Sequence, residues 1–229
     1  MNRLFIPALA LLFILSSCEK REPSVYEYEA EPVYTWGYAD FWGNYYGEYG
    51  ISENVLSLSL LTKELSVDST SNLVGIGQYL YLEDIFVAAS DTLLPEGTYA
   101  VSKNSAPFNI APGEILEIDG QKLEVGAFVY FLEKNPMFTI MKYIQEGTMK
   151  VAYSGNNTRL DFDFTLDDKT TIKGRFEGQL PYFDARYFNL GDAAVGSRYS
   201  ASVKTIMALF GNNTPISRLP AKRSSFVRF

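Results

Sequence analysis

The stretch MKVAYSGNNTRLDFDFTLDDKTTIKGRFEGQL, residues 149–180, decides the fold class. Apolar and polar residues alternate through it in three runs, and the turn-forming sequences SGNN and DDKT separate the runs. Alternation with a period of two places every second side chain on the same face of a β-strand. We therefore predict an antiparallel meander of three strands with one buried and one hydrated face.

The side chains expected on the buried face of this meander are aromatic, aliphatic or glycine. In the middle strand Phe162 and Phe164 alternate with Asp161 and Asp163. The buried face of the third strand is expected to carry Ile172, Gly174, Phe176, Gly178 and Leu180. Glycine repeated on an inward face predicts tight curvature or close packing of aromatic neighbours, as where a sheet bends into a barrel.

Further β-rich runs lie upstream of the meander and are separated by the breaks LPEGTY, APGE and KNPM. They predict strands at residues 55–61, 79–87, 98–101 and 127–132. No amphipathic helical pattern interrupts residues 43–181. We predict an all-β fold of about eight strands in one domain: an antiparallel, calycin-like barrel, with a β-sandwich as the alternative.

The amino terminus has the three parts of a secretory signal: basic Arg3, an apolar run over residues 4–15, and small Ser16 and Ser17. The run is shorter than the roughly 20 apolar residues that a transmembrane helix needs. We expect residues 1–17 to be a lipoprotein signal peptide.

Cys18 is the only cysteine of the chain. With the three residues before it, Cys18 forms the sequence LSSC, which resembles the bacterial lipobox, whose cysteine receives lipid, including palmitate, and becomes the new amino terminus. No second cysteine is present for an intramolecular disulfide. We expect attachment to the membrane through lipid on Cys18, since several acyl chains give stable anchoring. An ordinary signal peptide with an incidental cysteine is the alternative.

Residues 18–42 are expected to form a tether, because they begin with mixed charge and proline and without apolar periodicity. The sequence EKRE directly after Cys18 resembles the export signals of surface-exposed lipoproteins in Bacteroidetes-type bacteria. A solvated linker has the same composition. The expected location is the outer membrane, at the cell surface or on the periplasmic face.

Composition restricts the chemistry, since the chain has no histidine. Histidine is the commonest general base and metal ligand. The pairs Asp161 with Asp163 and Asp167 with Asp168 are expected on a wet strand face and in a turn. We predict no catalytic residue, no metal site and no cofactor, and hence no enzyme; a carboxylate-based hydrolase is a distant alternative.

Three motifs carry a resemblance to a known family. They are GNYYGEY at residues 43–49, LPEGTYAV at 94–101, and the meander together with the residues that precede it from position 146. These motifs resemble the calycin-like β-barrel lipoproteins of Bacteroidetes. The resemblance spans residues 43–181, which it assigns to the barrel domain. It implies a barrel or strongly curved sandwich and brings no established activity.

Aromatic residues are concentrated between positions 25 and 49, where they make up ten of twenty-five residues. Trp36 and Trp42 are the candidate ligand platform, because exposed aromatics stack on sugar rings or anchor protein partners. The alternative is that they plug the barrel or form its first strand. True lipocalins carry Gly-x-Trp near the first strand, whereas both tryptophans here precede a glycine, so a lipocalin pocket is not carried over.

Charge is distributed unevenly along the chain. Residues 182–229 form a basic carboxy-terminal extension of net charge +5, whereas residues 18–181 carry −13. The extension could lie across the acidic barrel, contact anionic lipid, or stay mobile. Nucleic acid is not expected as a partner, given the compartment and the net charge of −8 after removal of the signal.

Two short motifs resemble the O-glycosylation signal of exported Bacteroidetes proteins. They place candidate acceptors at Ser69 and Thr92, although Asp-Ser and Asp-Thr are also ordinary turn sequences.

The function expected from these observations is that of a lipid-anchored, non-enzymatic binding module for a glycan, an apolar small molecule or a protein. The alternative is a structural or assembly component of an outer-membrane protein complex. The sequence leaves the ligand and the oligomeric state open.

Overall fold

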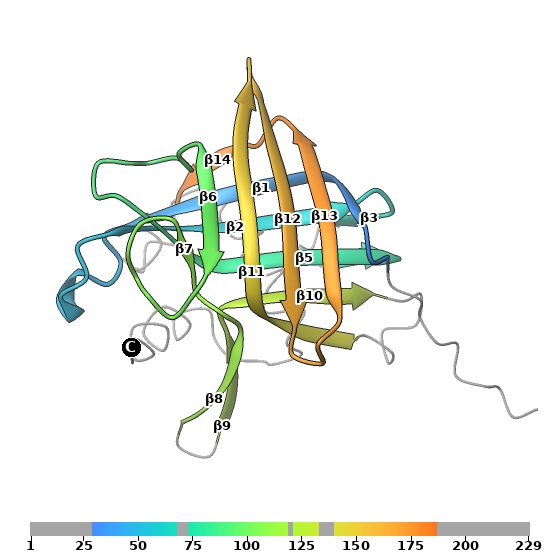
Figure 1. Cartoon of the computed structure of the whole chain (residues 1–229), viewed down its shortest axis with the longest axis horizontal. Coiled ribbons are helices and arrows are strands. Elements are labelled where there is room, and N and C mark those ends of the chain that lie inside the picture. The colour runs from blue at the N-terminus through green and yellow to red at the C-terminus, as the bar shows by residue number, and fades with distance from the viewer. Residues whose placement is uncertain (1–28, 68–72, 119–120, 133–139, 187–229) are drawn as a thin grey trace, which may run out of the picture.

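The computed structural model describes residues 29–67, 73–118, 121–132 and 140–186 and is almost entirely β in these segments (Figure 1). One short 3-10 helix, η1 (Gly47–Tyr49), follows the first strand. The strands are β1 (Val33–Gly43), β2 (Asn54–Thr62), β3 (Leu65–Val67), β4 (Leu73–Gly75), β5 (Gly77–Val87), β6 (Gly97–Val101), β7 (Asn109–Ile110), β8 (Glu114–Ile118), β9 (Gln121–Val125), β10 (Ala127–Leu132), β11 (Ile140–Ser154), β12 (Asn157–Leu166), β13 (Thr171–Gly178) and β14 (Tyr182–Asp184).

The main sheet closes into a barrel. Strands β1, β2, β5, β10, β11, β12 and β13 follow one another as antiparallel neighbours. Because their number is odd, the first and last strands point the same way, and β13 therefore pairs with β1 in parallel, with Val33 opposite Arg175. β14 continues this parallel pairing beside Ala39.

The gap between β5 and β11 is bridged twice. β10 pairs with both strands at one end, and at the other end β7 pairs with β5 while β6 pairs with β11. β6 and β7 are parallel to each other, which completes a circuit of eight strands. The predicted all-β barrel is confirmed, whereas the purely antiparallel pairing was wrong, because both closures contain a parallel pair.

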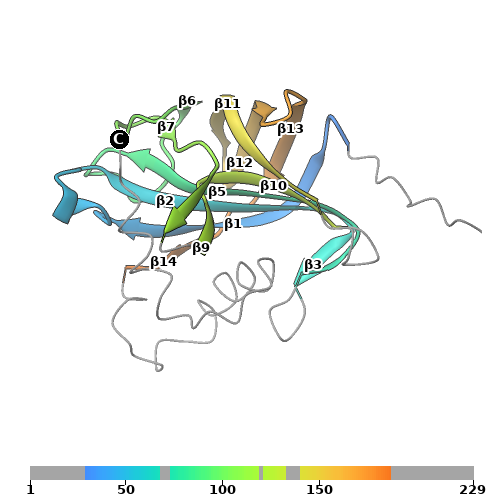
Figure 2. The ribbon, with the colours of Figure 1, turned by 90° about the horizontal axis from the view of Figure 1, so that it is seen from below.

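The barrel is flattened into two layers. In Figure 1, β6, β11, β12 and β13 run upright at the front, and β1, β2, β5 and β10 run across behind them. Figure 2 shows the same arrangement from below, with the β3 hairpin projecting from the layer that contains β1 and β2. Two further hairpins, β3–β4 and β8–β9, lie outside the barrel circuit.

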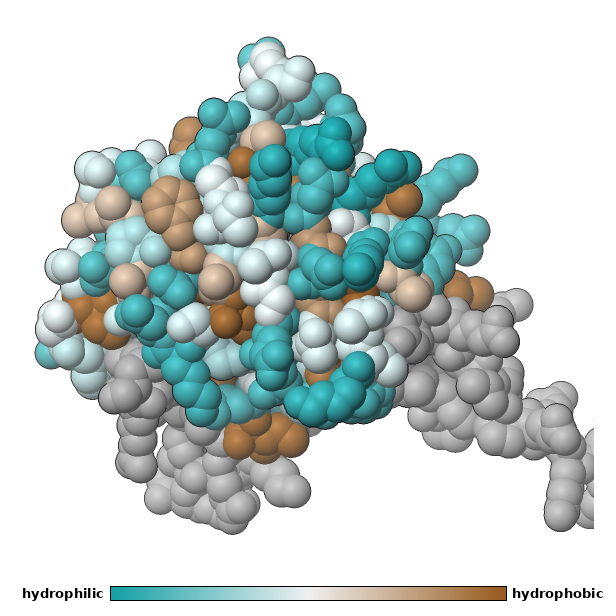
Figure 3. Space-filling model, in the orientation of Figure 1, coloured by the Kyte–Doolittle hydropathy of each residue, from teal (hydrophilic) through white to brown (hydrophobic). Residues whose placement is uncertain are grey.

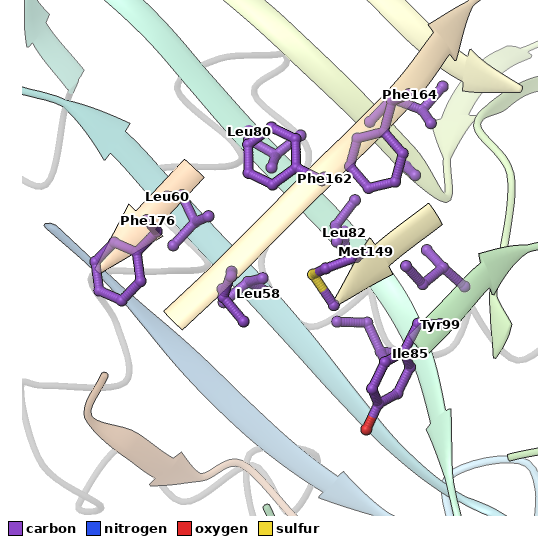
Figure 4. Close-up of a cluster of buried hydrophobic side chains, with 14 of the residues drawn as sticks. Leu58, Leu60, Leu80, Leu82, Ile85, Tyr99, Met149, Phe162, Phe164 and Phe176 are labelled. Carbon is purple, nitrogen blue, oxygen red and sulfur yellow. The ribbon is translucent and has the colours of Figure 1, made fainter. Parts of the chain in front are cut away.

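Side chains from both layers fill the barrel interior (Figure 4). Large buried residues of β12 and β13 face leucines of β2 and β5, and Phe162 stacks on Phe164 with 5.2 Å between ring centroids. Phe162 also contacts Tyr34 of β1 at 5.5 Å. The inward face predicted for the meander is confirmed at Leu160, Phe162, Phe164, Ile172 and Phe176, each at most 4% exposed.

The first strand begins earlier than the sequence suggested. β1 starts at Val33, inside the segment predicted to be a tether, so the barrel precedes the expected boundary at Gly43 by ten residues. Aromatic residues of this segment lie on both sides of the sheet, buried inside and half-buried outside, which hid the period-two alternation. At the other end, β14 extends the pairing of β1 beyond residue 181.

The outside of β11, β12 and β13 is hydrated, as predicted, and Figure 3 shows that this side is largely hydrophilic. Asp161 and Asp163 lie there and form ion pairs with Arg159 and Lys173 at 2.8 and 3.2 Å. Exposed pairs of this kind contribute at most about 1 kcal/mol. Tyr153 continues the alternation of Met149 and Val151 and was expected on the buried face, but it is exposed and donates a hydrogen bond to the Leu94 carbonyl at 2.6 Å.

Candidate binding face on the outside of the barrel

Packed side chains occupy the barrel interior, so the surface open to a ligand is the outside of the barrel. The layer formed by β1, β2, β5, β10 and the start of β11 differs from the hydrated layer. Most of its outward positions are aromatic, apolar or hydroxylated, with Asp40 on β1 as an acidic exception, and many are buried. β2 is buried at eight successive positions, Asn54–Leu61, so both of its faces are covered.

Strand register aligns these outward side chains in two rows that cross five strands. The first row joins Trp36, Leu61, Tyr79, Tyr130 and Met141. The second row joins Tyr38, Ser59, Tyr81, Phe128 and Tyr143. We call these ten residues the outer aromatic face. Directly opposed side chains on neighbouring strands are close enough to contact one another.

The centre of the outer aromatic face is tightly packed. Tyr79 and Tyr81 stack at 6.2 Å with nearly parallel rings, and Tyr81 contacts Phe128 at 5.2 Å. The hydroxyl groups of Tyr79 and Ser59 share a hydrogen bond of 2.9 Å. Complete burial raises the pKa of Tyr79 well above its usual value, so this phenol stays protonated. The packed residues at the centre of the outer aromatic face therefore stabilise the fold.

Trp36 and Trp42, the predicted platform, both lie on β1 and both are half-buried. The Trp36 indole N–H donates to the Leu65 carbonyl at 3.0 Å, at the base of the β3–β4 hairpin. The Trp42 indole N–H donates to the Ser57 hydroxyl at 3.0 Å, and its ring contacts Tyr45 edge to face at 5.9 Å. Trp36 belongs to the outer aromatic face, whereas Trp42 packs with a separate cluster at the far end of β1.

The half-exposed edge of the face combines tyrosines with a carboxylate. Tyr130 on β10 and Tyr143 on β11 are both half-buried, and Tyr143 forms a hydrogen bond with Glu124 of β9. Burial raises the pKa of Glu124, and the Tyr143 hydrogen bond opposes this only in part. Burial and the nearby Glu124 charge also raise the pKa of Tyr130 and Tyr143. Two phenols and one partly desolvated carboxylate thus meet at this edge, which we call the Glu124 edge.

A carboxylate whose pKa is raised lowers the stability of the fold when it ionises, so Glu124→Gln should raise the melting temperature at pH 7. The folded carboxyl keeps its proton to higher pH than the unfolded one, and the cost therefore appears as the pH rises above the usual value of 4.5. Thermal melts from pH 3 to 8 would measure it. The gain should vanish at the acid end, and an equal gain at every pH would contradict the electrostatic cause.

None of the other predicted site residues that the structure describes belongs to the Glu124 edge. Cys18 and Ser69 lie outside the described residues. Thr92 is exposed in the loop that follows β5, where a modifying enzyme could reach it. Asp167 and Asp168 lie in the β12–β13 turn, and the Lys142 ion pair at 2.7 Å, with Thr170, lowers the pKa of Asp168 to about 2.

Neither a metal-binding cluster nor a membrane-spanning helix is found among the residues that the structure describes. Among those residues, no group of three or more Cys, Asp or Glu side chains is placed to hold a metal ion. No helix in the same segments has the length and apolar character needed to cross a membrane.

Comparison of the chain with protein-family models, with curated proteins and with solved structures finds no match in any of the three. The class that the structure itself defines is a closed eight-stranded β-barrel of mixed strand direction.

The sequence did not point to Glu124, Tyr130 or Tyr143. Their meeting depends on the register between β5, β10 and β11 and on the position of the β8–β9 hairpin. One signal was present in the run GAFVYFL at residues 126–132, which is apolar at almost every position. Such a run indicates a strand covered on both faces, so its outward side chains are candidates for a contact surface.

Proposed function

We propose that this protein is a non-enzymatic binding module whose ligand surface is the Glu124 edge of the outer aromatic face. The observation that carries the proposal is the meeting of half-exposed Tyr130 and Tyr143 with the partly desolvated Glu124 carboxylate. A carboxylate retained at a cost in stability is typical of functional sites. The interior supports the same proposal, because packed side chains occupy the space that a barrel ligand would need.

The chemistry of the edge fits a glycan best among the ligands considered. Tyrosine rings offer flat apolar surfaces on which the C–H face of a sugar ring can stack, and their hydroxyls add polar contacts. The Glu124 carboxylate accepts hydrogen bonds only, and sugar hydroxyls are donors. A purely apolar ligand would leave this carboxylate buried without solvent, which carries a penalty.

Two substitutions at the edge test the binding function. Tyr130→Ala and Tyr143→Ala should each weaken retention on the binding polysaccharide at least about 10-fold, equal to about 1.4 kcal/mol. A panel of immobilised bacterial and host polysaccharides identifies the ligand, and calorimetry with soluble oligosaccharides gives the dissociation constants. Tyr49→Ala is the matched control, because Tyr49 is 49% exposed on η1 away from the edge.

The outcomes of that experiment separate binding from folding. Binding that is lost while the melting temperature changes little supports the ligand role of the edge. Binding that survives both edge substitutions, or falls equally with Tyr49→Ala, would place the ligand elsewhere. No retention on any polysaccharide, with capture of a protein or apolar molecule instead, would exclude the glycan.

The module is proposed to act at the outer membrane, held by lipid on Cys18. Support comes from the lipobox-like sequence LSSC and the apolar run before it. Several acyl chains suffice for stable anchoring without a membrane-spanning segment.

Cys18→Ser should abolish lipid attachment and move the protein from the membrane fraction to the soluble fraction. Fractionation of the native host, with the washed membranes tested at low and high salt, measures the change. High salt is needed because the basic residues of the extension could hold the protein electrostatically. Membrane retention of the variant at both salt concentrations would contradict lipid as the sole attachment.

A further inference from the structure

A strip of the barrel's outer surface is buried although its residues are polar or hydroxylated. The strip consists of Asp40, Ser57, Ser59 and Tyr81, which expose 4%, 1%, 1% and 3% of their surfaces. They lie side by side on β1, β2 and β5, since Asp40 pairs with Ser57 and Ser59 pairs with Tyr81. The interior cluster takes the alternate positions of the same strands, so the strip faces away from the barrel.

The described elements border the strip without lying across it. The β3–β4 hairpin reaches only the first row, where Leu65 packs with Leu61 and Tyr79 and accepts a hydrogen bond from Trp36. In Figure 2 the described strands drawn below β1 and β2 are β3 at one end and β14 at the other. Within the described residues, no strand lies over the strip between them. A sheet face this deeply buried requires a second layer.

We propose that residues 187–229 of this chain supply that layer by docking along the strip. The path of the chain is the first argument. β14 pairs with β1 from Ala39 to Phe41, and Phe183 of β14 contacts Tyr38 edge to face at 6.0 Å. The Arg186 guanidinium lies 5.3 Å from the centre of the Phe41 ring. The segment therefore starts at the border of the strip.

Charge is the second argument. Residues 187–229 carry six basic side chains and one acidic side chain, whereas the layer beneath contributes the buried carboxylates of Asp40 and Asp84. Asp40 accepts a hydrogen bond from Ser57 at 3.5 Å, and Asp84 accepts one from Tyr46 at 2.8 Å. A basic segment complements these charges, and its apolar run ASVKTIMALF at residues 201–210 offers side chains for the aromatic part of the face.

The amino-terminal segment fits the strip less well. Residues 18–28 have a net charge of −1, which does not complement buried carboxylates. The described chain also begins at the opposite end of the barrel, because the Glu29 carbonyl accepts a hydrogen bond from Gln78 and the Ala30 carbonyl accepts one from Lys173. Gln78 is the second residue of β5, whereas the strip extends towards β14.

Photo-cross-linking of the intact chain tests the docking. Tyr38→p-benzoylphenylalanine replaces a half-buried aromatic residue beside the strip by one of similar shape. Illumination followed by peptide mass spectrometry should link position 38 to peptides from residues 187–229. The matched control is Asp163→p-benzoylphenylalanine on the hydrated layer, where the side chain is 55% exposed, and it should yield few such links.

Three results would overturn the proposal: links from position 38 only to other molecules, equal yields from both positions, or links that join differently isotope-labelled copies in a mixed sample. The last result would assign the layer to a second copy. A second measurement does not depend on the substituted barrel. Replacing Arg198, Lys204 and Arg218 together by glutamate should raise hydroxyl-radical labelling of Tyr81 severalfold and leave Tyr49 unchanged; unchanged labelling of Tyr81 would contradict the electrostatic docking.

The inference is independent of the proposed glycan binding. The strip lies over β1, β2 and β5, whereas the Glu124 edge lies at β9, β10 and β11. Polysaccharide binding can therefore fail while the cross-links to residues 187–229 form, and the reverse is equally possible.

Discussion

Phe162→Ala should lower the free energy of unfolding by about 3–5 kcal/mol, the usual cost of removing a buried phenylalanine ring. Phe162 is 4% exposed and contacts Tyr34 and Phe164, so few neighbours can move into the space that the ring leaves. The loss combines the transfer energy of the ring with the cost of the cavity. Urea unfolding of the chain without residues 1–17, followed by circular dichroism, measures it.

The control for this prediction is the next residue, Asp163, which lies on the opposite face of β12. Asp163→Asn should change the stability by no more than about 0.5 kcal/mol, because Asp163 lies on the hydrated layer in an exposed ion pair with Lys173. Equal losses from Phe162→Ala and Asp163→Asn would mean that β12 does not present one face to the core and the other to water.

The meander from Met149 to Leu180 could be predicted from the sequence because one of its faces is in contact with water. Each polar residue in β12 and β13 marks an outward position, so the period of two is visible and the burial follows it. The polar turn sequences SGNN and DDKT likewise mark where the strands end. A strand can thus be recognised from a single sequence when one of its faces is in contact with water.

β1 could not be delimited in this way. Its outward side chains Trp36, Tyr38 and Trp42 are aromatic like several inward ones, so the apolar pattern has no regular period. The parallel pairing of β1 with β13 could not be predicted from the sequence either. Its direction depends on whether the number of strands between them is odd or even, which requires β6, β7 and β10 to be placed first. Pairing of strands far apart in sequence leaves no local signal.

The candidate site was less predictable than the fold. The sequence offered Trp36 as part of a candidate ligand platform. Trp36 lies on the outer aromatic face, and its indole N–H donates to a carbonyl of the same chain. Glu124 and Tyr143 come from different hairpins and meet only when the barrel closes. A site assembled across strands needs the register, and register is fixed by the packing of the whole barrel.

Gly174→Ala should lower the free energy of unfolding by about 1–3 kcal/mol, although alanine is better than glycine inside a strand. A Cβ at position 174 would lie 2.3 Å from the nearest ring carbon of Phe162, far inside van der Waals contact, and Pro32 is also close at 3.1 Å. The ring of Phe162 thus occupies the volume that any side chain at position 174 would need. Gly178 lies on the same face of the same strand, β13, where an added Cβ would meet Phe176 at an ordinary 3.5 Å.

Gly178→Ala is therefore the matched control, and it should be neutral or stabilising by up to about 1 kcal/mol, since it restricts the unfolded chain without overlap. A double-mutant cycle identifies the cause of the loss at position 174. Phe162→Leu shortens the side chain that causes the overlap, so Gly174→Ala should cost less in the Phe162→Leu background than in the original chain. Additive losses in this cycle, measured by urea unfolding, would show that contact with Phe162 is not the reason for glycine at position 174, and the approach of Pro32 would then be the remaining steric cause.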